Sequence, residues 1–536
     1  MKKINKIFGV CLMALPMACT GNYLDINTNP FEVSEEDMAT DGYAISSALS
    51  AIASTVISTD VNTAQFTDCL LGGPLGRYYS STIGSETTVD NNNATDDWTK
   101  VLMTSDHIIP KLYTNHKQIQ SLTKEPVVLA VADIIKVAAM HRVTDTFGPI
   151  PYSKIGQDGK IAIEYDSQEQ VYDKFFEELD NAIKVLTENQ MSGFSPKVDP
   201  VFDGTPLKWC RFANSLKLRL AMRIVYAAPE KARKYAEEAA SHPLGLISSN
   251  DDNAMLKPVQ FGDKGNPLYT AIKYNQVTGT NTGGDSHVAA DITTYMNGYK
   301  DPRREKYFIS SLFEGDENKY VGMRIGIVRP SLTTSSHKYS GINIAPSDPL
   351  LWMNASEVCF LKAEAASIFG FNMGSGTPEE FYNEGIRLSF KNWGAPGVEA
   401  YISDDELKPG SYTDPLSLNS YSSKLSTITI KWDDAATPEE KQERILIQKW
   451  IANYNLGLEA WSDFRRTGYP KFIPATKEGN QSFIVDNTLG PRRMPYPQQE
   501  YTNNRENILK ACNEYLNGKD NMVQRVWWDC NPATIK

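Results

Sequence analysis

The stretch QKWIANYNLGLEAWSDFRRTGYP, residues 448–470, holds a dense run of aromatic and arginine side chains. Its large apolar residues recur at helical spacing, which predicts one helical stripe that is buried in a core. The stripe comprises Trp450, Tyr454, Leu458 and Trp461. A guanidinium stacks on aromatic rings and forks onto carboxylates or carbonyls, so Arg465 and Arg466 are predicted to clamp the helix to the loop that follows. Gly468 and Pro470 then end the helix.

Two interpretations of this stretch stay open. In the first, it is the buried corner of a helical hairpin, and the arginine pair is satisfied internally. In the second, the aromatic rings form a platform for a ligand. The spacing favours the first interpretation, because rings on one helical stripe are placed to pack against neighbouring helices.

Further regions predict helices that pack in pairs. Residues 207–228 and 229–241 form one pair, residues 354–369 and 378–393 form a second, and residues 442–454 begin another. Alanines recur in both pairs where two helices must approach closely, as in tetratricopeptide units. The predicted fold is therefore mainly α, a single globular unit with a tetratricopeptide-like helix-pair scaffold. Long loop-rich insertions interrupt this scaffold at about residues 72–97, 244–350, 395–435 and 470–500.

The N-terminus has the order of a secretory signal followed by a lipid-attachment site. Lysines are frequent in Met1–Lys6, a short apolar run covers Ile7–Met17, and Cys19 follows Ala18. The apolar run is too short to cross a bilayer, which needs about 20 apolar residues. We therefore predict a signal peptide at residues 1–18, a lipid on Cys19, a polar tether at residues 19–37 and a helical domain at residues 38–536.

The mature chain is acidic. The formal net charge of the sequence is −11, and removal of residues 1–18, which contain Lys2, Lys3 and Lys6, leaves −14. A negative excess repels nucleic acid and anionic lipid surfaces, so neither is an expected partner of the polypeptide itself. No second apolar stretch of the sequence is long enough to span a membrane, so anchoring depends on Cys19.

The sequence offers little sign of catalysis or of metal binding. The HExxH, GxSxG, P-loop, GxGxxG and EF-hand spacings are missing. His141 and Asp145 could be half of a metal or acid–base site, but a capping or helix-end hydrogen bond is the favoured interpretation. Residues 90–97, DNNNATDD, are rich in oxygens that could bind calcium, yet they lack the glycine and the distal glutamate of an EF loop. We expect no catalytic residue, no resident metal and no cofactor.

Apart from Cys19, five cysteines remain in the mature chain, and the sequence has no CxxC pair or Cys/His spacing for zinc. Cys210 and Cys359 lie on apolar helical faces, which is typical of buried thiols. Whether Cys512 and Cys530 form a disulfide stays open.

Candidate ligand-binding residues lie in two of the insertions. Aromatic residues in Gly- and Asn-rich loops lie outside any helical stripe, so they have no evident core to fill. Sugars present C–H faces that stack on such rings and hydroxyls that bind Asn, Asp and Arg. We expect the two loops to meet on one face and to bind ligand through Arg77, Tyr78, Tyr79, Tyr269, Tyr274 and Asn275. Two alternatives remain: the tyrosines pin their own loops to the helices, or they face a partner protein.

Six segments spread over almost the whole chain carry a family resemblance. Among them are LDINTNP at residues 24–30, HRVTDTFGPIPYS at residues 141–153 and the stretch at residues 448–470. The others lie at residues 207–223, 352–366 and 525–528, the last ending in Trp527 and Trp528. Together they resemble the SusD-like (RagB/SusD) outer-membrane nutrient-binding lipoproteins of Bacteroidetes.

The resemblance implies a helical fold with four tetratricopeptide-like units and a loop-rich face for the ligand. It also implies a lipid-anchored protein at the cell surface that is not an enzyme. Such a protein binds an oligosaccharide or another polymer-derived nutrient and passes it to a SusC-like TonB-dependent porin in the outer membrane. The alternatives are a surface glycoside hydrolase, which would need a buried pair of carboxylates with unequal pKa values, and a peptide-binding receptor. The identity of the ligand does not follow from the motifs, because they lie on the scaffold.

Overall fold

The computed structural model describes residues 42–82, 88–103, 108–156, 162–258, 260–261, 265–273, 286–330 and 336–535. The buried apolar residues of these segments form one continuous core. The prediction of a mainly α protein in a single unit is confirmed.

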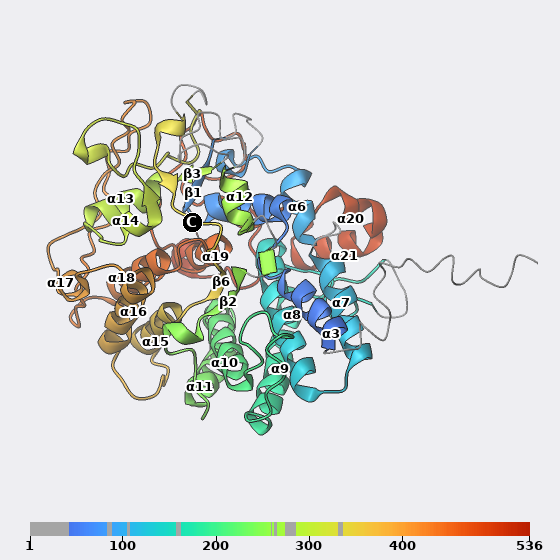
Figure 1. Cartoon of the computed structure of the whole chain (residues 1–536). Helices are drawn as coiled ribbons and strands as arrows, with labels where there is room; N and C mark the ends of the chain where they lie inside the picture. The colour runs from blue at the N-terminus through green and yellow to red at the C-terminus, as the bar shows by residue number, and fades with distance from the viewer. Residues whose placement is uncertain are drawn as a thin grey trace, which may run out of the picture.

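The scaffold consists of helices that pack in pairs. The pairs are α3 (Tyr43–Ala53) with α7 (Ile109–Leu122), α8 (Pro126–Phe147) with α9 (Gln168–Glu188), α10 (Pro206–Arg223) with α11 (Pro229–Ser241), and α15 (Ala355–Phe369) with α16 (Pro378–Trp393). In addition, α7 contacts α8, α9 contacts α10, and α10 contacts α15. The pairs therefore follow one another in an arc around the lower half of the molecule in Figure 1.

Small residues allow the close approach within each pair. Ala213 and Ala221 of α10 are buried, as are Ala236 and Ala239 of α11. In α16, a Cβ atom on Gly385 would come within 2.8 Å of the Phe360 ring of α15. The alanine pattern thus identified both predicted pairs correctly.

The N-termini of several scaffold helices are fixed by capping boxes. Ser167 accepts a hydrogen bond from the backbone N–H of Gln170, whose side chain accepts one in return from the Ser167 backbone. Thr377 and Glu380 cap α16 in the same way. Each box satisfies backbone donors that a helix start leaves unpaired.

The insertions contain short elements joined by loops. The segment from residue 61 to residue 103 holds α4 (Val61–Ala64), the π-helix η2 (Gln65–Gly72), α5 (Gly73–Leu75), β1 (Tyr79–Ser81), η3 (Val89–Asn91) and α6 (Asp96–Met103). The largest insertion holds η4 (Asn250–Asp252), β2 (Ala254–Leu256), α12 (Pro267–Lys273), β3 (Ser286–Val288), α13 (Ala290–Gly298), α14 (Arg304–Tyr307), β4 (Phe308–Ile309), η6 (Asp316–Asn318), η7 (Ser336–Lys338), β5 (Gly341–Ile342) and β6 (Leu350–Met353). Strands pair antiparallel as β1 with β3, β2 with β6, and β4 with β5.

The C-terminal third completes the molecule. It holds α17 (Val398–Ile402), α18 (Pro438–Ala452), α19 (Gly457–Thr467), α20 (Gln498–Asn503), α21 (Arg505–Tyr515) and η8 (Pro532–Thr534). Helix α18 packs on α15, and α19 lies near the centre of the molecule, where it contacts α5, η2, α8 and α10.

The stretch at residues 448–470 is a helical corner rather than one helix. Helix α18 ends at Ala452, α19 begins at Gly457, and Asn455 between them has a φ of 82°. The four predicted residues therefore lie on two helices and between them rather than on one stripe, because a left-handed residue breaks the helix. All four stripe residues are nevertheless buried. The buried-corner interpretation is confirmed, and the ligand-platform interpretation does not fit, since the rings have no exposed face.

A close backbone crossing explains the glycine in this corner. A Cβ atom on Gly457 would lie 2.1 Å from the carbonyl oxygen of Gly72, and one on Gly76 would lie 2.5 Å from the carbonyl oxygen of Gly457. Real Cβ atoms do not come so near to a backbone atom. Only glycine allows the start of α19 to lie against the end of η2.

The arginine pair clamps the corner as predicted. The Arg465 guanidinium carbon lies 3.5 Å from the centroid of the Trp461 ring and 4.6 Å from that of Trp528. It also donates a 2.9 Å hydrogen bond to the carbonyl of Arg492, which lies in the loop that follows. Arg466 forks onto Glu364 of α15 at 2.7 and 2.8 Å. The C-terminal tryptophan cluster is thus part of the core.

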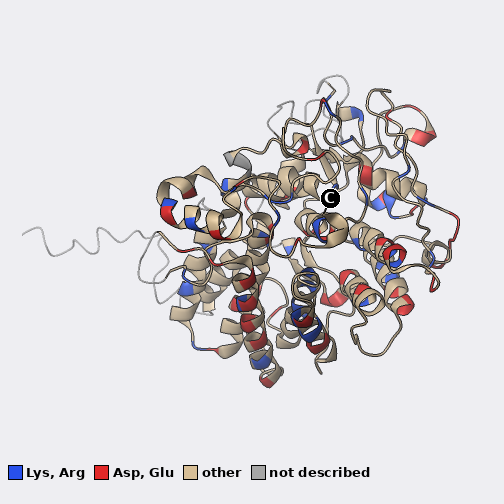
Figure 2. Ribbon diagram, turned by 180° about the vertical axis from the view of Figure 1, so that it is seen from behind, with Lys and Arg blue, Asp and Glu red and all other residues tan. Residues whose placement is uncertain are grey.

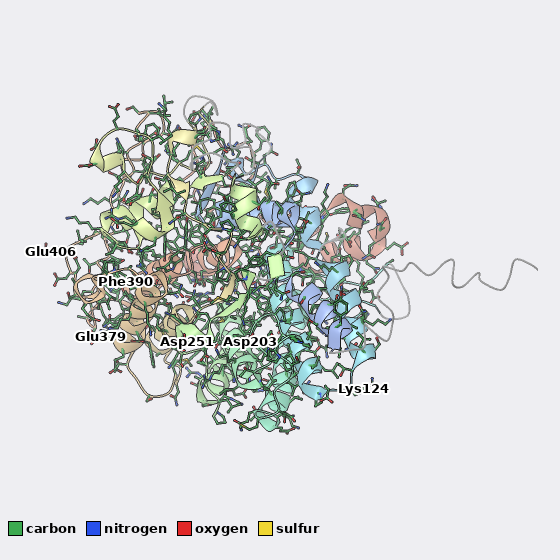
Figure 3. The ribbon with its side chains drawn as sticks, in the orientation of Figure 1. Lys124, Asp203, Asp251, Glu379, Phe390 and Glu406 are labelled. Atoms are coloured by element: carbon green, nitrogen blue, oxygen red, sulfur yellow. The ribbon has the colours of Figure 1, made fainter. Side chains whose placement is uncertain are left out.

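Charged side chains cover the surface and balance one another locally. In Figure 2, acidic positions line α9 beside basic positions of the neighbouring helices, and Lys231 of α11 bridges Glu169 and Asp173 of α9. In Figure 3, Lys124 and Glu406 lie at the rim of the molecule, whereas Phe390 is buried.

The structure bears on two points left by the sequence, the presence of a membrane-spanning helix and the state of the cysteines. Among the helices that the structure describes, none is long and apolar enough to cross a membrane. Cys512 and Cys530 are both free thiols, as are Cys69, Cys210 and Cys359.

Candidate functional site

The two insertions that were expected to carry the ligand meet in the structure. Strand β1 of the first insertion pairs with β3 of the largest insertion, with Tyr79 opposite Val288 and Ser81 opposite Ser286. The backbone N–H of Ala289 also donates to the carbonyl of Tyr78 at 2.9 Å. The two segments therefore lie side by side in the upper part of Figure 1.

The rings of Tyr78 and Tyr79 do not face solvent, and the prediction that they bind ligand is contradicted by their burial. Tyr78 is 0% exposed, and its ring stacks on that of Trp450 with centroids 5.7 Å apart. Tyr79 is likewise buried and donates from its hydroxyl to the side chain of Asn455. Burial raises the pKa of both hydroxyls well above the ordinary value. These tyrosines pin their own loop to the scaffold, which was the stated alternative.

The other residues predicted to bind ligand differ in how much of their surface is open to solvent. Arg77 is largely buried, has a φ of 62°, and lies 5.5 Å from the centroid of the Phe472 ring. Tyr269 lies half-buried on α12, where its backbone N–H donates to the Asn266 side chain. Tyr274 and Asn275 lie outside the described residues. Arg77 therefore serves the core, and Tyr269 keeps part of its surface open.

Side chains that bond to backbone groups join the loops around β1 and β3 into one surface. The amide of Asn91 donates to the carbonyls of Ile327 and Gly479, at 3.1 and 2.5 Å. Arg324 reaches the carbonyls of Asn419 and Pro474, at 3.0 and 2.7 Å. We call this surface the loop face and define it by residues 324–330, 412–421 and 472–487.

The acidic run at residues 90–97 contributes to this network. Asp90 accepts hydrogen bonds from the backbone N–H of Ser81 at 2.8 Å and from the Ser80 hydroxyl at 3.2 Å, and it lies 3.7 Å from the Arg329 guanidinium. Within the part of the chain that the structure describes, no group of three or more His, Cys, Asp or Glu residues is placed to hold a metal ion. Asp90 thus ties η3 to β1.

The loop face carries large apolar side chains that point into solvent. Phe483 is 104% exposed, and Val328, Leu418 and Ile484 are each more than half exposed. The Phe483 backbone is nevertheless held in place, because Asn480 accepts from the N–H of Ser482 at 3.0 Å and donates to the carbonyl of Val485 at 2.8 Å. A fully exposed ring on a constrained loop is placed to stack on a ligand.

Phe483 was not among the residues predicted to bind ligand, although the sequence around it carries the same signal. It lies in the polar segment EGNQSFIVDN, residues 478–487, outside any helical stripe. The same reasoning that selected Tyr78 applies to it. What the sequence did not show is which of these rings the scaffold covers.

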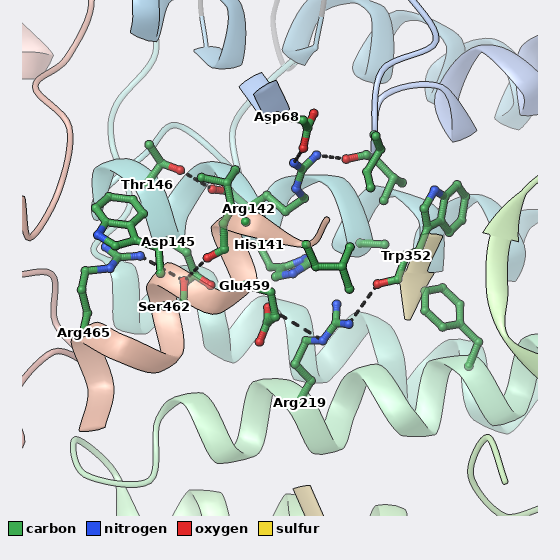
Figure 4. A pocket seen from close by; sticks show the side chains of 18 residues that line it. Asp68, His141, Arg142, Asp145, Thr146, Arg219, Trp352, Glu459, Ser462 and Arg465 are labelled. Atoms are coloured by element: carbon green, nitrogen blue, oxygen red, sulfur yellow. Dashed lines mark hydrogen bonds and ion pairs between the residues drawn. The ribbon is translucent and has the colours of Figure 1, made fainter. Parts of the chain in front are cut away.

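A second candidate is the buried cavity at the centre of the molecule, between α8, α10 and α19 (Figure 4). It is lined by charged side chains that include His141, Asp145, Arg219, Glu459 and Arg465. Its volume is only about 30 Å³. A cavity of this volume has room for a few water molecules at most, so it is too small for a sugar or a peptide.

The cavity residues form an internal charge network. Arg219 binds Glu357 in a bidentate pair at 2.8 and 2.6 Å, and Arg223 pairs with Glu459. Asp145 accepts from the Tyr172 hydroxyl at 2.6 Å and from the Trp528 indole at 2.8 Å. These bonds satisfy buried polar groups and join the N-terminal pairs to the C-terminal segments.

His141 and Asp145 do not cap a helix, which corrects that half of the prediction, whereas Asp145 does make hydrogen bonds in the last turn of α8. The Nδ1 atom of His141 lies 3.2 Å from the carbonyl oxygen of Val137, one turn earlier in the same helix. Burial, reinforced by the Arg219 charge, lowers the pKa of His141 to about 3. The ring is therefore neutral at physiological pH.

The network also contains two carboxylates with opposite pKa shifts. Burial raises the pKa of Asp145, in spite of Arg223 and the Tyr172 hydroxyl. Burial alone would raise the pKa of Glu459 as well, but Arg223, Arg219 and Lys449 outweigh it and hold that pKa well below its ordinary range. Opposite shifts can mark a catalytic pair. Here the two groups face a cavity that excludes substrate.

Comparison with known proteins agrees with this architecture. The family model described as "SusD-like: Susd and RagB outer membrane lipoprotein" matches residues 25–529. The chain belongs to the SusD-like family. A search of curated protein sequences gives no match.

Solved structures of SusD homologues cover nearly the whole chain. One from Bacteroides uniformis is 56% identical, with a TM-score of 0.88, and the match covers 91% of this chain and 100% of that one. One from Bacteroides thetaiotaomicron is 37% identical, with a TM-score of 0.82, and the match covers 91% and 99% of the two chains. A chitin-binding SusD homologue from Flavobacterium johnsoniae is 34% identical, with a TM-score of 0.82 and coverages of 92% and 100%. The fold of this SusD-like chain therefore matches the folds of those relatives over nearly their full length.

Proposed function

We propose that this SusD-like protein is a cell-surface lipoprotein that binds an oligosaccharide and delivers it to a SusC-like TonB-dependent transporter of the outer membrane. The observation that carries the proposal is the family match over residues 25–529, to outer-membrane lipoproteins. The ligand class is supported by the homologue from Flavobacterium johnsoniae, which is described as chitin-binding.

The loop face is the proposed ligand surface. Asp90 and Asn91 join its loops to the buried β1–β3 ribbon, where two distant insertions meet, and it exposes Phe483 completely. A phenyl ring stacks on the C–H face of a sugar, and the neighbouring polar groups bind hydroxyls. Tyr269 on α12 is a second proposed contact, because part of its surface is open. Tyr274 and Asn275 stay proposed contacts from the same insertion.

Attachment to the membrane is proposed to follow from the N-terminus. Residues 1–18 are the proposed signal peptide, Cys19 the lipid-modified residue, and residues 19–37 the tether. A lipid on Cys19 places the domain at the cell surface beside a transporter. Two acyl chains or more give the stable anchoring that this role needs.

The protein is proposed to act by binding alone. The buried carboxylates Asp145 and Glu459 are the pair whose pKa values diverge, and the cavity beside them has a volume of only about 30 Å³. A glycosidase needs room for a sugar ring between its two carboxyl groups. The architecture therefore supports a receptor.

A glycan and peptide array probed with the soluble mature chain tests the function. We expect binding to one class of oligosaccharide and no release of shorter products during incubation.

Calorimetry with the oligosaccharide that binds most tightly then compares Phe483→Ala with a control, Met191→Ala. Met191 is also an apolar residue, it is 93% exposed, and it lies on a different surface. Phe483→Ala should weaken binding roughly fivefold or more, since a stacked ring contributes on the order of 1 kcal/mol. Exclusive binding of peptides, or turnover at catalytic protein concentrations, would contradict the proposal.

A further inference from the structure

A polar cleft lies on another part of the molecule. It opens between α21 and the segment that leads from the end of α8 into α9, and its volume is about 230 Å³. Figure 1 shows α21 at one side of the molecule, apart from β1 and β3. The cleft is therefore separate from the loop face and from the small central cavity.

Two walls form this polar cleft. One wall carries Lys154, Glu164 and Asp166, and the other carries Lys510, Glu514 and Tyr515 of α21. The first wall is held in place: Asp166 accepts from the backbone N–H of Ser153 at 2.7 Å and from the Ser153 hydroxyl at 2.8 Å, and Lys154 pairs with Glu164. The second wall is a helix. Both walls are thus set before any ligand arrives.

Each wall offers both donors and acceptors of hydrogen bonds. Carboxylates only accept, and the ammonium groups of Lys154 and Lys510 only donate. Tyr515 adds an aromatic side chain, and the residue is 39% exposed. Burial together with the neighbouring carboxylates raises the pKa of Tyr515, so its hydroxyl remains a donor. A ligand with many hydroxyl groups, each able to donate and to accept, matches this mixture.

Other ligand classes fit less well. Three carboxylates against two lysines give the cleft a net negative charge, which disfavours an anion. Among the described residues, no group of three ligating side chains is arranged for a metal ion. A cleft lined mainly by charged side chains also disfavours an apolar molecule. Its volume of about 230 Å³ leaves room for one sugar ring with its hydroxyls.

We propose that the polar cleft is a binding site for a single sugar unit, with Tyr515 stacking on the ring and Glu164, Glu514 and Lys510 binding its hydroxyls. This site is a second carbohydrate contact. It does not depend on what the loop face binds, because no residue is shared between the two surfaces. On a polymer chain, two such contacts would raise the apparent affinity through simultaneous engagement.

Saturation-transfer NMR on the soluble mature chain, with D-glucose, D-galactose and N-acetyl-D-glucosamine as separate probes, tests the proposal. We expect transfer to at least one sugar. Tyr515→Ala and Glu514→Gln should each weaken its binding roughly fivefold or more, in keeping with about 1 kcal/mol per contact. The matched controls on the same helix, Leu509→Ala and Glu506→Gln, should bind as the parent does.

The outcome separates this site from the loop face. Phe483→Ala should leave binding of the single sugar unchanged, and thermal melting should show that every variant is folded. Absence of transfer to all three sugars would overturn the proposal. So would unchanged binding in folded Tyr515→Ala and Glu514→Gln variants, or loss of binding in Phe483→Ala.

Discussion

The hydroxyl of Tyr78 donates a 2.6 Å hydrogen bond to the backbone carbonyl of Trp450, 372 positions further along the chain. The two rings are also stacked. One residue of the first insertion is thereby fixed to the last turn of α18. The contact explains why a tyrosine in a polar loop serves stability instead of ligand binding.

We predict that Tyr78→Phe lowers the free energy of unfolding by about 1–3 kcal/mol, because a buried carbonyl loses its donor. Chemical denaturation measures the loss. Tyr43→Phe is the control, since Tyr43 is exposed on α3 and should have no effect. Oligosaccharide affinity should stay the same in both variants. Weaker binding without a change in stability would return Tyr78 to the ligand site.

Trp461→Ala is predicted to destabilise the fold without a selective loss of ligand. The ring is buried, its indole N–H donates to the carbonyl of Pro491 at 3.0 Å, and Arg465 stacks on it. Truncation of a buried tryptophan costs about 3–5 kcal/mol. Calorimetric melting should show a clear decrease in Tm, whereas exposed Leu418→Ala should melt like the parent. A variant that melts normally but binds no ligand would show that the corner is a binding surface.

The buried His141 predicts a dependence of stability on pH. Its pKa is about 3 in the folded protein and about 6.5 in the unfolded chain. Above pH 6.5 the His141 ring is neutral in both the folded and the unfolded state, so it does not make the free energy of unfolding depend on pH. Below that pH the unfolded chain takes up a proton that the folded protein excludes, and stability falls by about 1.4 kcal/mol per pH unit until pH approaches 3.

Chemical denaturation at pH 7 and pH 5 checks this expectation. The parent should lose about 2 kcal/mol more than His141→Gln over that interval, because only the parent carries the titrating ring. His116→Gln is the control, since it removes a histidine on a different helix, one that lies 2.7 Å from Asp133. Equal pH dependence in the parent and His141→Gln would show that His141 takes up a proton in the folded state.

Cys19→Ala in the full-length precursor is predicted to abolish lipid attachment and to leave a product without an anchor. Metabolic labelling with a fatty-acid analogue reads out the modification. Cys11→Ala should keep the label, because Cys11 lies inside the apolar run of the signal. Label retained on Cys19→Ala would exclude Cys19 as the attachment site.

The scaffold could be predicted from the sequence because its signals are local. Alanine spacing and helical periodicity placed the pairs formed by α10 with α11 and α15 with α16, and the Ser167 capping box marked the start of α9. The helix break at Gly457 was harder to predict, because it depends on the close contact of Gly457 with the backbone of Gly72, which lies 385 positions away in the chain. Burial of loop rings is decided by such distant contacts. Tyr78 and Phe483 look alike in sequence, yet one is covered by Trp450 and the other by nothing among the described residues.

The bonds that join the loop face have an evolutionary consequence. Asn91 and Arg324 hold neighbouring loops through carbonyl oxygens of the main chain, which every amino acid supplies. Exposed side chains beside the contacted positions can therefore be exchanged without loss of the bond, whereas Gly479 cannot, because a Cβ atom there would lie 2.1 Å from the carbonyl oxygen of Gly326. Recognition can drift from one nutrient to another while the platform keeps its shape, provided that the asparagine and the arginine are retained.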